Sequence, residues 1–105
     1  MTNPYRYLTE KYEAAVLALA TSPAPLRTRL RDAYSDHASR VAPADAPAEL
    51  RRDVQRLADL MTSAATPHSR IAASVEAMSE EQVARAASLI VEIAFSAQRG
   101  YYLAG

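Results

Sequence analysis

The sequence predicts an all-α fold: an antiparallel four-helix bundle in up-down-up-down order, with room for a short connecting helix before the last helix. Apolar residues recur at spacings of three and four along most of the chain, which is the period of an amphipathic helix. Glycine occurs only at positions 100 and 105, and no alternating run of β-branched residues indicates a strand. Proline-containing segments divide the chain into stretches with short connections, which favour antiparallel neighbours. The 105 residues are expected to form one domain, residues 1–105.

The first helix is expected to begin at Asn3, a favourable N-cap, with Pro4 at the first helical position, where its missing N–H has no partner to lose. Its apolar stripe consists of Leu8, Tyr12, Ala15 and Leu19. The prolines at 23 and 25 predict that this helix ends near Thr21.

The second helix is expected to run from Pro23 to Val41. Its apolar stripe consists of Leu26, Leu30, Ala33, His37 and Val41. Residues 42–47 contain two prolines and predict a turn, with Asp45 as the cap of the next helix.

The third helix carries Leu50, Val54, Leu57 and Met61 on one stripe and is expected to end near Ala64. Residues 66–70 are typical of a loop. The apolar residues Ile71, Val75 and Met78 then allow one or two further helical turns.

The last helix has the clearest start signal in the chain. Ser79 and Gln82 have the spacing of a capping box, in which each side chain satisfies a backbone N–H of the other residue. Met78 and Val83 have the positions of a hydrophobic staple around that cap. This helix is expected to run from Glu80 to Arg99, with Gly100 as its C-cap.

Two features of the expected bundle predict surplus apolar surface. The last helix is apolar on more than one side, so either it lies at the centre of the monomer or one side is a dimer interface. Most tyrosines are expected at the end where the first helix begins and the last one ends, either as a plug of the bundle or as a partner surface. The interaction surface predicted on this basis comprises Tyr5, Tyr12, Val91, Phe95, Tyr101 and Tyr102.

Composition excludes several classes of function. Twelve basic and twelve acidic residues balance, so no net charge attracts nucleic acid or an anionic membrane. The chain has no cysteine, and its two histidines lack ligand-like spacing, so neither a metal site nor a cofactor is expected. The polar N-terminus and the lack of a long apolar run predict a cytoplasmic protein without a membrane span, and the alanine- and arginine-rich composition suggests a bacterial source.

One segment on the second helix offers an enzymatic alternative. Arg31, Asp32 and His37, within the run Arg-Asp-Ala-Tyr-Ser-Asp-His, resemble the motif of HEPN ribonucleases, a small, all-helical and often dimeric family of toxin and defence systems. The resemblance implies that His37 acts as acid or base at the cleaved RNA linkage. It also implies that Arg31 stabilises the phosphorane charge and that Asp32 orients the pair.

The chain shows none of the common catalytic patterns: no nucleophile with a partnered base, no glycine-rich phosphate loop and no zinc-binding helix motif. The favoured expectation is therefore a non-enzymatic bacterial protein that acts through protein–protein contacts, with itself as a homodimer or with a protein partner. An RNA-cleaving HEPN-like toxin is the alternative.

Overall fold

The computed structural model describes residues 3–64 and 69–104, and within these ranges the all-helical prediction is confirmed. The described residues form five α-helices: α1 (Arg6–Thr21), α2 (Leu26–Asp36), α3 (Arg51–Met61), α4 (Arg70–Ala77) and α5 (Glu80–Ala104). Three short 3₁₀ helices lie between α2 and α3: η1 (Ala38–Arg40), η2 (Pro43–Asp45) and η3 (Ala48–Leu50). The short helix that the sequence allowed before the last helix is thus present as α4.

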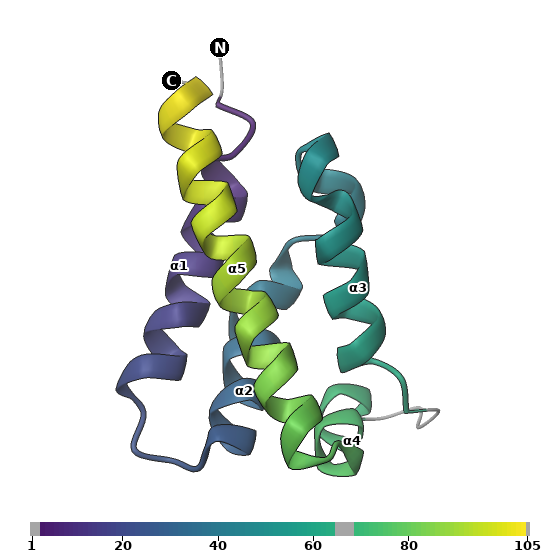
Figure 1. The fold of residues 1–105 in the computed structure, drawn as a ribbon. Coiled ribbons are helices and arrows are strands. Elements are labelled where there is room, and N and C mark those ends of the chain that lie inside the picture. The colour runs from purple at the N-terminus through teal and green to yellow at the C-terminus, as the bar shows by residue number, and fades with distance from the viewer. Residues whose placement is uncertain (1–2, 65–68, 105) are drawn as a thin grey trace.

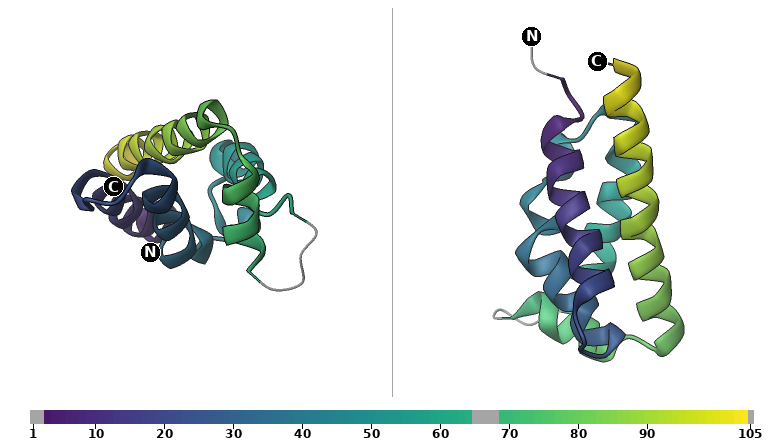
Figure 2. Two further views of the ribbon diagram at one scale, coloured as in Figure 1. Left: turned by 90° about the horizontal axis from the view of Figure 1, so that it is seen from below. Right: turned by 90° about the vertical axis from the view of Figure 1, so that its left-hand side faces the viewer.

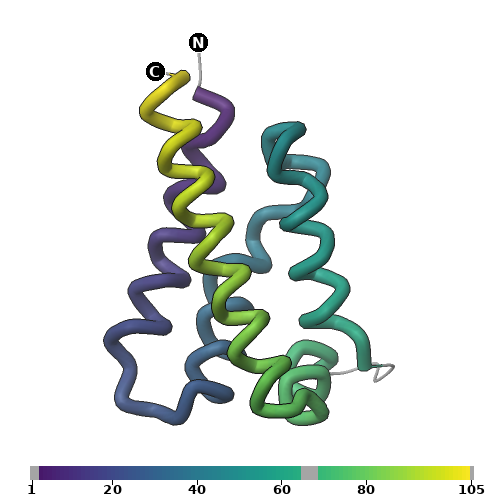
Figure 3. The backbone as a smooth tube through the Cα atoms, viewed as in Figure 1, coloured from purple at the N-terminus to yellow at the C-terminus, as the bar shows by residue number. Residues whose placement is uncertain are grey.

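The longest helix, α5, organises the molecule. It packs antiparallel against α1, and the two termini lie at the same end (Figures 1 and 2). α2 and α3 also pack on α5, and α4 lies at the end opposite the termini (Figure 3). The 25 residues of α5 are about 37 Å long at 1.5 Å per residue. Since the longest dimension of the molecule is 41 Å, α5 alone among the described helices spans it.

The predicted helix start at Asn3 is wrong, because α1 begins at Arg6 with Tyr5 as its N-cap, and Asn3 lies in the turn before the helix. The Asn3 side chain accepts a hydrogen bond from the backbone N–H of Tyr5 at 3.0 Å. Its amide also donates to the backbone oxygen of Tyr101 at 2.9 Å. Asn3 therefore stabilises the turn before α1 and joins this segment to the end of α5.

The second helix is shorter than expected at both ends. Pro25 precedes its first turn, and the helix breaks after Asp36, where His37 has φ −129° and ψ −70°. The break turns the chain into η1, and both Ala38 and Val41 then enter the core. His37 is consequently the C-cap of α2 and not a member of its apolar stripe, which is a correction of the predicted stripe.

The predictions around the third helix also need correction. Asp45 lies in η2 and makes no capping hydrogen bond, and α3 begins only at Arg51. The helix ends at Met61 and not near Ala64. The backbone N–H of Ala64 donates instead to the hydroxyl of buried Ser74 at 2.9 Å, which joins the end of α3 to α4.

The predicted start of the last helix is confirmed. The Ser79 backbone N–H donates to the Gln82 side chain at 2.8 Å, and the Gln82 N–H donates to the Ser79 hydroxyl at 3.1 Å. Met78 and Val83, the predicted staple, both belong to the apolar interior. Glu80 and Glu81 occupy the first turn, where they favour the positive end of the helix dipole.

The predicted C-cap at Gly100 is wrong, because α5 continues to Ala104. Gly100 lies inside the helix, where the ring of Tyr5 approaches its backbone. A β-carbon added at Gly100 would lie 2.6 Å from Cδ1 and 2.7 Å from Cζ of that ring. The glycine therefore permits a close contact between the two ends of the chain.

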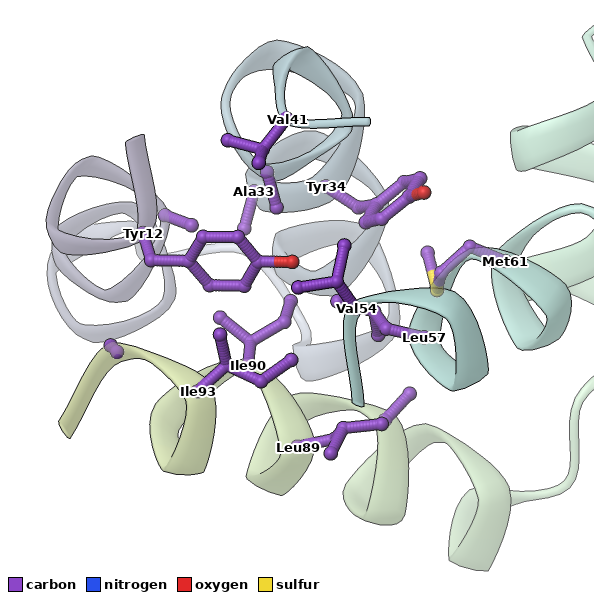
Figure 4. Close-up of a cluster of buried hydrophobic side chains, with 14 of the residues drawn as sticks. Tyr12, Ala33, Tyr34, Val41, Val54, Leu57, Met61, Leu89, Ile90 and Ile93 are labelled. Atoms are coloured by element: carbon purple, nitrogen blue, oxygen red, sulfur yellow. The ribbon is translucent and has the colours of Figure 1, made fainter. Parts of the chain in front are cut away.

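The core lies between α5 and the other helices, and Tyr12 points into its middle (Figure 4). Tyr12 is completely buried, and its hydroxyl has no hydrogen-bond partner among the described residues. Burial raises the pKa of the Tyr12 phenol, with a smaller contribution from Tyr34. Burial likewise raises the pKa of Tyr34, and the carboxylate of Asp59 adds to the shift.

Candidate interaction surface

α5 carries apolar side chains on two opposite sides. The buried side consists of Val83, Ala86, Leu89, Ile90, Ile93, Ala94 and Ala97. A second line of residues follows the outward side at alternating spacings of four and three, which is the spacing of a coiled-coil seam. We call this line the outer stripe; it consists of Ala84, Ser88, Val91, Phe95, Gln98 and Tyr102.

The outer stripe holds two of the most exposed large apolar side chains in the described residues. Phe95 is 60 % exposed and Tyr102 is 72 % exposed, whereas Val91 between Ser88 and Phe95 is half-buried. A single exposed apolar side chain is normal on a protein surface, but a line of them at helical spacing is typical of a contact surface. The prediction that α5 is apolar on a second side therefore has a structural counterpart.

A groove of about 680 Å³ runs beside the outer stripe, between α1, the start of α2 and α5. Its apolar lining includes Val16, Leu19, Ala20, Leu26, Ala87 and Val91. Ala84 and Phe95 also line it, and so they belong to both the groove and the outer stripe. We call this the α1–α5 groove.

The one arginine of the groove is engaged by the backbone. Arg29 donates from Nη1 to the backbone oxygen of Leu19 at 2.6 Å and from Nε to that of Ala24 at 2.8 Å. The first acceptor lies in the last turn of α1, and the second lies in the connection between α1 and α2. Glu92 is the acidic residue of the lining and is exposed. The groove thus offers apolar contact with charge at its edge.

The tyrosines predicted to gather at the terminal end separate into two groups. Tyr5 and Tyr101 are half-buried and Tyr102 is exposed at that end, and the rings of Tyr101 and Tyr102 meet edge to face at 5.6 Å. Tyr12 lies in the core with no exposed surface, so its placement on the interaction surface needs correction. The residue was predicted correctly on the apolar stripe of the first helix and belongs there alone.

The three residues of the enzymatic alternative lie on α2 and at its C-terminal end. Arg31 pairs through Nε with Oδ1 of its neighbour Asp32 at 3.0 Å, and both line a hollow that also includes Ser69 and Arg70. His37 lies beyond the end of α2 and makes no side-chain hydrogen bond to either residue in the described part of the chain. The resemblance to HEPN ribonucleases stays a prediction.

Other site classes find little support in residues 3–64 and 69–104. No group of three or more histidine, aspartate or glutamate side chains in these ranges is placed to hold a metal ion. His68, the second histidine, lies outside the described residues. None of the described helices is long and apolar enough to cross a membrane.

Comparison with protein-family models, curated proteins and solved structures finds no match for this chain.

The sequence pattern revealed one wall of this surface and missed the other. Val91, Phe95 and Tyr102 share a side of α5 by spacing alone. The contributions of Val16, Ala20 and Leu26 depend on how α1 and α2 pack against α5, and no local pattern in the sequence carries that information. The high exposure of Leu17 (62 %) and Leu103 (81 %) was missed for the same reason.

Proposed function

We propose that this chain is a non-enzymatic protein that acts through protein–protein contacts, and that the outer stripe and the α1–α5 groove form its contact surface. The observation that carries the proposal is the heptad-like spacing of exposed apolar residues on the outward side of α5. Such a stripe is stabilised when a second helix packs on it and removes Phe95 from water.

A second copy of the chain is the favoured partner. Two-fold dimers are the commonest soluble oligomers, and a symmetric dimer needs only one surface that is complementary to itself. The α1–α5 groove and the protruding Phe95 ring provide a hollow and a knob on the same surface. We take the fold to be a variant of a four-helix bundle, in which the short α2 and α3 lie beside the long α5. We also take the protein to come from the bacterial cytoplasm, as its composition suggests.

The direct test is absolute mass by light scattering over a hundredfold range of protein concentration. We expect a dimer that dissociates on dilution, and we expect Phe95→Asp to be monomeric at concentrations where the wild type is dimeric. Leu103→Asp is the matched control, because Leu103 is more exposed than Phe95 but lies off the outer stripe.

Two results would overturn self-association: a wild-type monomer throughout the range, or a dimer that survives Phe95→Asp. The helical circular dichroism of each variant must match that of the wild type, so that a change in mass reports on the contact and not on folding.

A further inference from the structure

We infer that the second copy binds antiparallel and in one register, with Phe95 of each copy packed against Ala84 of the other and Arg85 of each paired with Glu92 of the other. This inference rests on the proposed function and specifies the geometry of that contact. Its evidence is the charge and the size of the residues on and beside the outer stripe.

The antiparallel direction of the partner helix follows from the residues on the two flanks of the outer stripe. One flank carries Arg85, Glu92 and Arg99 at intervals of seven residues, and the other carries Ala87, Ala94 and Tyr101. In an antiparallel pair related by a two-fold axis through the stripe, each flank faces the same flank of the partner. The two charged flanks therefore face each other. In a parallel pair the charged flank would face the uncharged one. The charges can therefore pair across the contact only in the antiparallel arrangement.

These charges are available for such pairing. None of the ion pairs within the described residues involves Arg85, Glu92 or Arg99. All three side chains are exposed on the isolated chain. An exposed triplet of alternating sign beside an apolar seam is the arrangement that sets partner choice and orientation in coiled coils.

The alternating signs exclude most registers. Sliding one helix by a full heptad from the proposed register places Glu92 opposite Glu92, and Arg85 opposite Arg99, so every close pair is repulsive. Two registers place opposite charges together: one pairs Arg85 with Glu92, and the other pairs Glu92 with Arg99.

The sizes of the stripe residues choose between these two registers. The first places Phe95 opposite Ala84 and Val91 opposite Ser88, so that both of these large side chains meet a small one. The second places Phe95 opposite Gln98, which would bury an amide at the seam without a polar partner.

The first register also places the Phe95 ring at the level of the partner's α1–α5 groove. Ala84 and Ala87 leave that part of the groove open, and Leu26 borders it. Each copy thus supplies both a ring and the hollow that receives the partner's ring. We therefore assign the register that pairs Arg85 with Glu92.

Charge exchange tests the register by light scattering of the full chain. Glu92→Arg should weaken the dimer about tenfold, because two symmetric attractive pairs become repulsive. Adding Arg85→Glu should restore the wild-type dimer, since the exchanged charges pair again. Adding Arg99→Glu to Glu92→Arg is the matched control and should not restore it.

The outcomes separate the register from the proposed function. Rescue by Arg99→Glu and not by Arg85→Glu would assign the other register and overturn the inference. A dimer that Phe95→Asp dissociates but Glu92→Arg leaves unchanged would also overturn the register, while the contact surface would stand. A wild-type monomer would contradict both the proposed contact surface and the proposed register. Thermal melts monitored by circular dichroism check that each variant is folded.

Discussion

The ring of Tyr5 lies against the backbone of Gly100, in the space that a β-carbon at residue 100 would occupy. Glycine inside a helix is unfavourable by about 1 kcal/mol relative to alanine. Here the residue permits a contact that joins the start of α1 to the last turns of α5. The hydrogen bond from Asn3 to the backbone oxygen of Tyr101 lies beside it and reinforces the same junction.

Gly100→Ala should lower the free energy of unfolding by about 1 kcal/mol, although alanine is the better helix former. The added methyl group displaces the Tyr5 ring, and the loss of its packing outweighs the gain in helix propensity. Chemical denaturation monitored by circular dichroism measures the difference.

A double-mutant cycle with Tyr5→Ala isolates the contact. Once the ring has been removed, Gly100→Ala should stabilise the protein by about 0.5–1 kcal/mol, since only the propensity term remains. If Gly100→Ala changed the free energy of unfolding in the same direction with and without the Tyr5 ring, the contact with Tyr5 would not be the reason that glycine is favourable at this position.

The unpaired hydroxyl of Tyr12 makes Tyr12→Phe a stabilising substitution. A buried polar group without a partner costs about 1–3 kcal/mol, and phenylalanine keeps the ring that fills the core. We expect the free energy of unfolding to rise by about 1 kcal/mol. Tyr34→Phe is the control: the Tyr34 hydroxyl is not among the buried groups without a partner, so its removal should change stability by less than about 0.5 kcal/mol. A loss of stability in Tyr12→Phe would show that the hydroxyl does have a partner, such as a bound water.

The raised pKa values of Tyr12 and Tyr34 predict a loss of stability in alkali. Both phenols bind their protons more tightly in the folded chain than in the unfolded chain, whose tyrosines titrate near 10.0. Their contribution is therefore complete below pH 10 and declines as the pH rises above it. The urea concentration at the midpoint of unfolding should therefore be lower at about pH 11 than at about pH 8. It should fall less in Tyr12→Phe, and an equal fall in both proteins would contradict the assignment to Tyr12.

The sequence predicted those parts of the fold that depend on neighbouring residues. The capping box at Ser79 and Gln82 is made by two side chains three residues apart, so its pattern is local and was found correctly. The apolar stripes of α1 and α3 follow from helical periodicity in the same way. The outward apolar side of α5, with Val91 and Phe95, was found because it too lies on one helix.

Several of the wrong predictions involve contacts between distant segments. Gly100 resembles a helix terminator until the position of Tyr5 is known. His37 continues the periodic stripe of α2, yet the helix breaks there so that Ala38 and Val41 reach the core. Arg27 lies off the apolar stripe of α2, yet its guanidinium binds residues about fifty positions later in the chain.

Arg27 joins the start of α2 to the junction between α4 and α5. Its Nη1 donates to the backbone oxygens of Val75 and Met78, each at 2.6 Å, and its Nη2 reaches a carboxylate oxygen of Glu80 at 2.8 Å. The first two acceptors lie at the end of α4, where carbonyls lack partners within the helix. The last acceptor contributes least, because the Glu80 side chain is 89 % exposed and an exposed ion pair is weak.

Arg27→Ala should therefore lower the free energy of unfolding by about 2 kcal/mol, chiefly through the loss of charge-assisted hydrogen bonds to two backbone carbonyls. Arg31→Ala is the matched control, one turn further along α2, since its guanidinium pairs only with its exposed neighbour Asp32 and its removal should cost less than about 0.5 kcal/mol. Glu80→Gln should also have a small effect.

Hydrogen exchange supplies a local readout. In Arg27→Ala the amides of α4 should exchange faster than the loss of global stability accounts for, whereas the exchange rates of the α1 amides should change only as much as global stability changes. If Arg27→Ala and Arg31→Ala destabilise the protein equally, the carbonyl bonds contribute nothing and α4 is held by its apolar contacts alone.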